Sequence, residues 1–242
     1  MAHSLKSETF RLSAICLGAL AVSACGSPKI APQHAAVVTL YIDISRSMPL
    51  IDNPAFAERV IEQVGREVRD LELGDEVRVF VVGNRTADRA VSLPKISTGY
   101  NLRIPEAATR VQKNMRDLIA EHRQDGGDDA TNLLFALENS HPICTPRSRV
   151  ILISDGIEAN DSYSVVRALA NGTDISLPKA QQPYLKGCSV TFYGMGISSE
   201  TGAGIEAQPL ANSPMQALTN AWRTYLRSAG VNNDAITIHS MV

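Results

Sequence analysis

The chain has 242 residues and a formal net charge of −2; 44% of its residues are hydrophobic but only 5% are aromatic. This length accommodates one large domain with a tail, whose core must be built from aliphatic side chains. The charge gives no electrostatic reason for a nucleic-acid partner, so we expect none.

The N-terminus has the pattern of an export signal. Lys6 and Arg11 precede the apolar run LSAICLGALAVSA, which has the length of a signal-peptide core. The run is shorter than the about 20 residues that span a bilayer. It ends in VSAC, residues 22–25, which resembles the lipobox of bacterial lipoproteins. That resemblance implies a signal peptide over 1–24 and acylation of Cys25; the alternative is an ordinary signal peptide with an incidental cysteine.

The segment after this cysteine predicts a tethered domain. Residues 25–36 carry prolines and small residues without periodicity, which is typical of a tether. The lipid would hold the protein at a membrane of the cell envelope, on the periplasmic side. Gly26, rather than an aspartate, follows the cysteine, and this is compatible with the outer membrane. We expect a domain over 37–230 and a tail over 231–242 that could add an edge strand.

Strands and helices alternate along the predicted domain. The continuous β-branched run VVTLYID predicts a buried strand, and apolar residues spaced on one face predict the helix after it, with Asn53 as its N-cap. Ser213 is the expected cap of the last helix. The expected elements are strands over 37–43, 75–83, 148–156 and 188–196, an edge strand over 87–97, and helices over 53–71, 104–123, 131–140, 162–171 and 213–230.

This alternation predicts the α/β class. We expect a doubly wound, mostly parallel sheet flanked by helices, with an antiparallel edge strand. Pro94 restricts its segment to the edge, since proline cannot donate to a ladder. In such sheets, ligands bind outside the carboxyl ends of the strands, where the strand order reverses.

Side chains that carry oxygen gather where these strands end. The first strand ends in Asp43, followed by Ser45 and Ser47, and the strand VILIS is followed by Asp155. Thr131 stands at the start of a helix expected between them. Each residue alone fits a helix cap or a loop hydrogen bond. Together they form a set of hard oxygen ligands, which selects Mg²⁺, Mn²⁺ or Ca²⁺ rather than zinc or copper.

The set resembles the metal-ion-dependent adhesion site of von Willebrand factor A (vWA) domains. The matching positions are Asp-x-Ser-x-Ser at 43–47, then Thr131, then Asp155 with Gly156. The resemblance covers 37 to about 230 and is specific because three separate segments agree, each next to the expected strand or helix. It implies a vWA/Rossmann-like fold.

The resemblance also implies a role for each residue. Ser45, Ser47 and Thr131 would ligate the ion or approach it closely, whereas Asp43 and Asp155 would act largely through bound water. Hydroxyl ligands are neutral, so the cation would keep most of its charge. An acidic side chain from a protein partner could then complete its shell.

Two features depart from the family pattern. Arg46 stands where glycine is common, and it could point to solvent, recruit a partner's carboxylate or weaken the metal site. Asp128 and Asp129 precede the threonine where small residues are common, and they either tune the ion or solvate the loop.

Cys144 and Cys188 are the two cysteines of the predicted domain. An even pair in an exported protein predicts a disulfide. The resemblance makes the strands that follow them neighbours, with both thiols at the end opposite the metal.

Three functional hypotheses remain from the sequence. The first is a lipid-anchored, non-enzymatic envelope module that binds an acidic protein partner through its cation. The second is a metal-dependent hydrolase such as a phosphoesterase, which needs a nucleophile or general base that no histidine or glutamate spacing supplies. The third is a vWA scaffold with a vestigial metal site. We expect the first, and therefore no enzymatic activity.

Overall fold

The computed structural model describes residues 35–83, 91–99, 101–159, 164–171, 173–198 and 208–240. The predicted signal peptide, the lipidation site Cys25 and most of the tether lie outside these residues. The described residues all belong to one unit, His34–Val242. Its elements are β1 (Val37–Asp43), α1 (Pro54–Arg69), β2 (Glu76–Val82), β3 (Val91–Ser97), α2 (Ile104–Asp125), α3 (Leu133–Ser140), β4 (Arg149–Ile153), α4 (Val165–Asn171), β5 (Ser189–Tyr193), β6 (Ile197–Ser198), β7 (Gln208–Pro209), α5 (Asn212–Ser228), the 3₁₀ turn η1 (Asn233–Ala235) and β8 (Ile236–His239).

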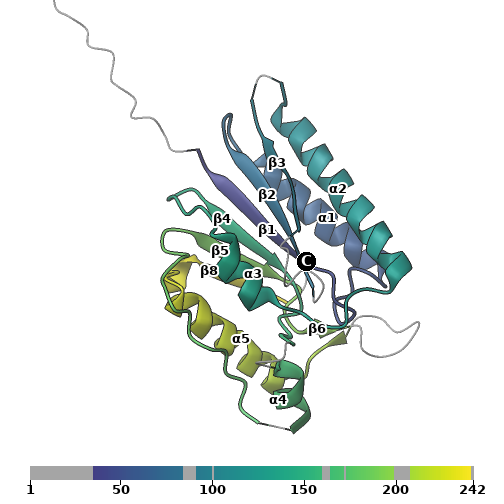
Figure 1. Ribbon diagram of the computed structural model, residues 1–242, viewed down its shortest axis with the longest axis vertical. Helices are drawn as coiled ribbons and strands as arrows, with labels where there is room; N and C mark the ends of the chain where they lie inside the picture. The colour runs from purple at the N-terminus through teal and green to yellow at the C-terminus, as the bar shows by residue number, and fades with distance from the viewer. Residues whose placement is uncertain are drawn as a thin grey trace, which may run out of the picture. The chain divides into compact units, whose positions relative to one another are not determined.

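The main sheet has the strand order β3-β2-β1-β4-β5-β8 (Figure 1). β1 lies between β2 and β4 and is parallel to both, and the pairs β4–β5 and β5–β8 are also parallel. β3 is antiparallel to β2 and forms one edge. This arrangement confirms the predicted doubly wound, vWA/Rossmann-like α/β fold with an antiparallel edge strand.

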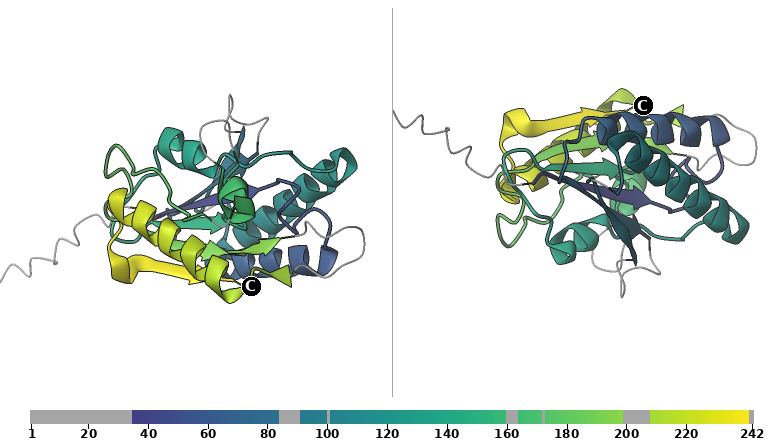
Figure 2. Two further views of the ribbon diagram at one scale, coloured as in Figure 1. Left: turned by 90° about the horizontal axis from the view of Figure 1, so that it is seen from below. Right: turned by 90° about the horizontal axis from the view of Figure 1, so that it is seen from above.

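Helices cover both faces of the sheet because side chains alternate along each strand. Val38, Leu40 and Ile42 of β1 belong to one buried cluster with the apolar faces of α1 and α2. Tyr41, on the opposite face, belongs to a second cluster with α3 and α5. The right-hand view in Figure 2 shows α1 and α2 beside each other, and Figure 1 shows both helices apart from α5.

The first helix begins as its sequence predicts. The side chain of Asn53 accepts a hydrogen bond from the amide of Phe56, 2.9 Å away, and Pro54 is the first helical residue. The helix therefore starts directly after the loop that follows β1. This places the loop between a buried strand and a capped helix.

The start of α5 corrects one prediction. Ser213 does not cap this helix; Ala211 is the N-cap, without a side-chain hydrogen bond, and the helix begins at Asn212. The first-turn amides of a helix have no acceptor within the helix, so Pro214 is tolerated at any of these positions. Its presence therefore does not fix which residue comes first.

Cys144 and Cys188 form a disulfide with their Cα atoms 4.7 Å apart. The bond joins the segments that lead into β4 and β5, at the amino ends of these neighbouring strands. The C-terminal tail supplies β8 at the far edge of the sheet. Within the described ranges, no helix is long and apolar enough to cross a membrane.

Candidate metal centre

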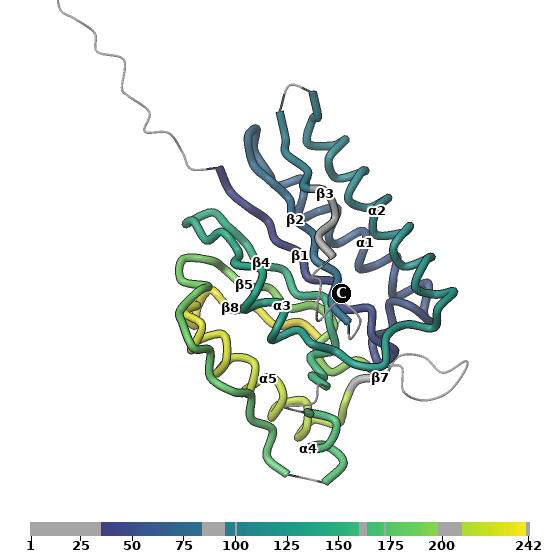
Figure 3. The backbone as a smooth tube through the Cα atoms, viewed as in Figure 1, coloured from purple at the N-terminus to yellow at the C-terminus, as the bar shows by residue number. Residues whose placement is uncertain are grey.

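The reversal of strand order lies between β1 and β4. β2 follows β1 along the chain and pairs on one side of it, whereas β4 pairs on its other side. The backbone trace in Figure 3 shows the loops after β1 and β4 leaving the same edge of the sheet. This is where a doubly wound fold places its ligand.

Asp43 lies at the centre of the predicted metal set and is fully buried. Its Oδ1 accepts the amide of Ser45 at 2.8 Å. Its Oδ2 accepts the hydroxyl of Ser154 at 2.6 Å and that of Thr131 at 3.4 Å. Burial raises the pKa of the Asp43 carboxyl above its ordinary value, against the hydrogen bonds, which lower it. This carboxylate therefore joins three loops: the first loop, 44–53, the second loop, 126–132, and the third loop, 154–159.

Ser45 and Ser47 present their hydroxyls to one another, with 3.1 Å between the Oγ atoms. Ser45 is buried and Ser47 is half-buried. The loop after β1 thus carries a buried hydroxyl, that of Ser45, next to a more accessible one, that of Ser47. Together with Asp43 and Thr131, they form one connected group of oxygens.

The second loop is fixed to the first by backbone pairing. The amide of Asp128 donates to the carbonyl of Ile44 at 3.0 Å, and the amide of Arg46 donates to the carbonyl of Asp128 at 2.9 Å. Gly127 lies at this contact with φ 75°, and a Cβ there would lie only 3.0 Å from the Ile44 carbonyl oxygen. The pairing brings Thr131, which is buried, against Asp43.

The third loop carries Asp155, which is also fully buried. Its Oδ1 accepts the amide of Ile157 at 2.8 Å. Gly156 has φ 72°, and its carbonyl accepts the indole N–H of the buried Trp222 at 2.9 Å. A Cβ on Gly156 would lie 2.7 Å from Sδ of Met195, so glycine is required here by both conformation and space. Packing from Met195, which follows β5, and from Trp222 of α5 thus holds the Asp155 loop.

Sequence reasoning missed Ser154, which links Asp155 to the rest of the set. Its hydroxyl donates to Asp43 and accepts the amide of Gly156 at 3.0 Å. In the parallel register, Ile42 pairs with Ile153, so the next residues along, Asp43 and Ser154, face each other. The signal was a polar residue directly before Asp155, and it becomes visible only once the strands are aligned.

Glu158 is a second residue that sequence reasoning missed. Its buried carboxylate accepts the amides of Leu133 and Leu134 at 3.1 and 3.3 Å. The N-cap of α3, Asn132, makes no side-chain cap bond, so Glu158 takes that role from a distant loop. No local pattern predicts this contact, which ties the Asp155 loop to the helix after Thr131.

The residues that depart from the family pattern have different positions. Arg46 is exposed and extends over the second loop, where its Nε donates to the carbonyl of Gly126 at 3.1 Å. Its Nη1 lies 3.0 Å from Oδ1 of Asp129, also exposed. Asp128 is buried, with its carboxylate against Gly83, where a Cβ would lie 2.1 Å from Oδ2. Arg46 is therefore not folded into the group of hydroxyls.

The donor set fits a hard divalent cation. Among the described residues, the buried charged side chains are all acids, and four of these carboxylates lie in the second and third loops and at the end of β1: Asp43, Asp128, Asp155 and Glu158. In the part of the chain that the structure describes, no three or more histidines, cysteines or acids form a group that could hold a metal by themselves. The predicted set combines two carboxylates with three hydroxyls, so any ion here would be held by oxygen alone, as Mg²⁺ prefers.

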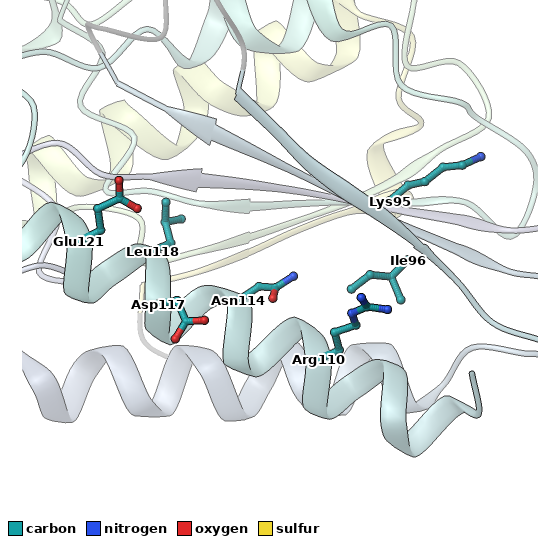
Figure 4. A pocket seen from close by; sticks show the side chains of 7 residues that line it. All are labelled: Lys95, Ile96, Arg110, Asn114, Asp117, Leu118 and Glu121. Atoms are coloured by element: carbon teal, nitrogen blue, oxygen red, sulfur yellow. The ribbon is translucent and has the colours of Figure 1, made fainter. Parts of the chain in front are cut away.

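Two pockets lie outside this site. One of about 340 Å³ separates the edge strand β3 from α2, and another of about 190 Å³ lies near the disulfide. Figure 4 shows cationic side chains at one end of the larger pocket and acidic ones at the other. Its lining residues are Lys95, Ile96, Arg110, Asn114, Asp117, Leu118 and Glu121. None of the five predicted metal residues lines either pocket.

No protein-family model and no curated protein matches the sequence. Among solved structures, the conserved hypothetical protein BatB from Bacteroides thetaiotaomicron is 16% identical, with a TM-score of 0.46 over 86% of this chain and 92% of that one. An aerotolerance-related membrane protein from Bacteroides fragilis is 15% identical, with a TM-score of 0.44 and coverage of 86% and 92%. Proximal thread matrix protein 1 from the mussel byssus is 12% identical, with a TM-score of 0.43 over 86% of this chain and 44% of that one. Similarity at this level assigns neither family nor function.

Proposed function

We propose that this protein is a lipid-anchored binding module of the cell envelope that holds an acidic protein partner through a divalent cation. Asp43, Ser45, Ser47, Thr131 and Asp155 would hold Mg²⁺, Mn²⁺ or Ca²⁺. The ion would supply a positive charge with a coordination position for a partner's carboxylate. The vWA resemblance implies an adhesion-type site of this kind.

The observation that carries the proposal is the hydrogen bonding around Asp43. One buried carboxylate joins Ser45 of the first loop, the threonine of the second and the serine before Asp155. Three segments far apart in sequence therefore place their oxygens at the reversal of strand order. A structural explanation needs a helix cap or turn at each position separately, whereas a cation explains why they converge.

We propose binding without turnover. A general base needs a lone pair that can reach substrate, but the acids of this site accept hydrogen bonds from fixed donors. Asp43 accepts bonds from three residues, and Glu158 accepts two amides at the start of α3. Sustained hydrolysis of phosphoesters with Mg²⁺, abolished by Asp155→Ala, would contradict this part of the proposal.

Thr131→Val tests the cation site. The substitution keeps the side-chain shape but removes the hydroxyl, whose bond to Asp43 is long at 3.4 Å, so the fold should lose little stability. We expect at least about 10-fold weaker Mg²⁺ and Mn²⁺ binding by calorimetry, in the mature chain with Cys25→Ser. In the parent, Mg²⁺ at 100 times its Kd should add about 2.7 kcal/mol to the free energy of unfolding, and thus raise Tm by about 5–10 °C.

Thr109→Val is the matched control, because Thr109 is an exposed threonine on α2. It should leave cation binding unchanged. If the parent shows neither binding heat nor a change in Tm with either ion, the cation mechanism is wrong. Equal affinities for the parent and Thr131→Val would instead exclude Thr131 from the site.

The lipid anchor is proposed from the N-terminal sequence alone. Cys25→Ala should abolish incorporation of labelled palmitate and release the chain from the membrane fraction of a bacterial host that processes lipoproteins. The described contacts of the candidate metal centre all lie in the unit that begins at His34, and Cys25 lies outside it. The substitution should therefore leave that centre intact, so the full chain can be tested. A variant still labelled with palmitate would contradict acylation at this cysteine.

A further inference from the structure

Arg46 and Asp129 form an exposed ion pair beside the candidate metal centre, and we call these two residues the rim pair. Ser45 and Ser47 turn their hydroxyls toward each other, and Arg46 between them extends across the second loop. It is fixed there by its bond to the Gly126 carbonyl and lies 3.0 Å from Asp129. The side chains of Arg46 and Asp129 are 62% and 74% exposed. A partner that reaches the loop carrying Ser45 and Ser47 would therefore meet an exposed guanidinium group that originates between them in the sequence.

The backbone fixes the rim pair relative to the metal residues. Arg46 and Ile44 are both bonded to the backbone of Asp128, at 2.9 and 3.0 Å. A Cβ on Gly127 would lie 3.4 Å from Cγ of Arg46, so the arginine stem passes directly over this glycine. The backbone position from which the Arg46 side chain extends is thus fixed by the same pairing that brings the second loop to the first. Its position is a property of the site and not of a free surface side chain.

We infer that Arg46 is a second anchor for the acidic partner, so that the preferred partner segment carries two carboxylates. One would reach the cation and the other would bind Arg46 in place of Asp129. This inference rests on the proposed cation site. It names the partner chemistry and assigns Asp129 the role of an internal competitor.

Replacing the Asp129 carboxylate on Arg46 by a carboxylate of the partner costs little free energy. Exposed ion pairs contribute little to stability, so Asp129 can be displaced without disturbing the fold. A guanidinium group binds a carboxylate through two parallel N–H donors, which gives the incoming acid a defined geometry. Its Nε bond to the Gly126 carbonyl, which does not involve Asp129, can persist during the exchange.

The positive charge of Arg46 affects cation binding and acidic-ligand binding in opposite directions. A positive side chain beside the site repels a cation but attracts an acidic ligand. Arg46→Gln should therefore leave Mn²⁺ affinity unchanged or raise it, while it weakens the binding of an acid with two carboxylates. If Arg46 only braced the second loop, its loss would weaken the binding of both.

The test uses Mn²⁺ and two capped peptides, Glu-Gly-Glu and Gln-Gly-Glu. Mn²⁺ binding is followed by electron paramagnetic resonance, and peptide binding by the broadening that bound Mn²⁺ causes in the peptide proton signals. We expect the parent to prefer Glu-Gly-Glu by about 5-fold or more, and Arg46→Gln to reduce this to the about 2-fold that two equivalent acids give by statistics. Asp129→Asn should increase the preference, and Arg46→Lys should retain part of it.

Arg110→Gln controls for net charge, because this exposed arginine lies roughly 24 Å along α2 from Gly126. It should leave the preference as in the parent. If Mn²⁺ binds but the parent shows no preference, or binds neither peptide, the second anchor is wrong while the cation site stands. The same holds if Arg46→Gln keeps the full preference. If Mn²⁺ does not bind the parent, the proposed function fails and this inference fails with it.

Discussion

Replacing both disulfide cysteines, by Cys144→Ala with Cys188→Ala, is expected to lower the free energy of unfolding by about 4 kcal/mol. The bond joins residues 44 positions apart, and a cross-link over a loop of this length removes unfolded-state entropy worth about 4 kcal/mol at 25 °C. Alanine avoids placing a hydroxyl at the buried position of Cys188.

Urea denaturation at equilibrium measures this loss. The parent with a reducing agent should lose most of the same stability, because it also lacks the cross-link; the double variant additionally loses the packing of the buried Cys188 sulfur. Cation affinity should be unchanged, since the disulfide lies at the amino ends of β4 and β5, whereas the metal residues follow the carboxyl ends of β1 and β4. A loss below about 1 kcal/mol would show that strain or residual structure cancels the entropic effect.

The sequence predicts those parts of the fold that depend on local patterns. Val37 to Ile42 is an apolar run that ends in an acid, so its strand and its buried position follow from the local sequence alone. The Asn53–Pro54 pair defines the start of α1 because both residues favour helix starts for reasons within a few residues. Alternation of such elements then leaves few α/β topologies, and the end of β1 falls at the site in nearly all of them.

The parts that the sequence does not reveal depend on contacts between distant segments. Ser154 faces Asp43 only because β1 and β4 pair in one particular register, and no local pattern fixes that register. Glu158 caps α3 across a gap of 25 residues. The direction of Arg46 depends on the second loop, whose two left-handed glycines shape the contact. The metal residues could be named from spacing, but the side chains that orient them could not.

Asp43→Asn is expected to weaken Mg²⁺ binding about 100-fold and yet to stabilise the cation-free fold. The carboxylate is fully buried, and that burial raises its pKa. The folded chain therefore holds a proton more tightly than the unfolded chain. Stability should then decrease as the pH rises from the ordinary pKa of an aspartate through the raised pKa of Asp43.

Asparagine removes this buried charge but keeps most of the contacts. Its oxygen can accept the Ser45 amide, and its amide nitrogen can donate to the hydroxyls of Ser154 and Thr131, which can rotate. In buffer with a chelator at pH 7, we expect the free energy of unfolding to rise by on the order of 1 kcal/mol. Losing an acid that orients metal ligands typically lowers affinity by about 10–100-fold, and Asp43 joins three loops, so we expect the upper end.

Urea unfolding from pH 4 to 7, with chelator and with Mg²⁺, checks both signs in one experiment. Asp117→Asn, at an exposed acid on α2 that pairs with Lys113, is the matched control and should change neither quantity by much. If Asp43→Asn lowers the free energy of unfolding in chelator and also weakens Mg²⁺ binding, Asp43 is a structural hydrogen-bond acceptor. If the substitution raises the free energy of unfolding in chelator and abolishes its increase with Mg²⁺, the buried Asp43 carboxylate destabilises the cation-free fold and serves to bind a cation.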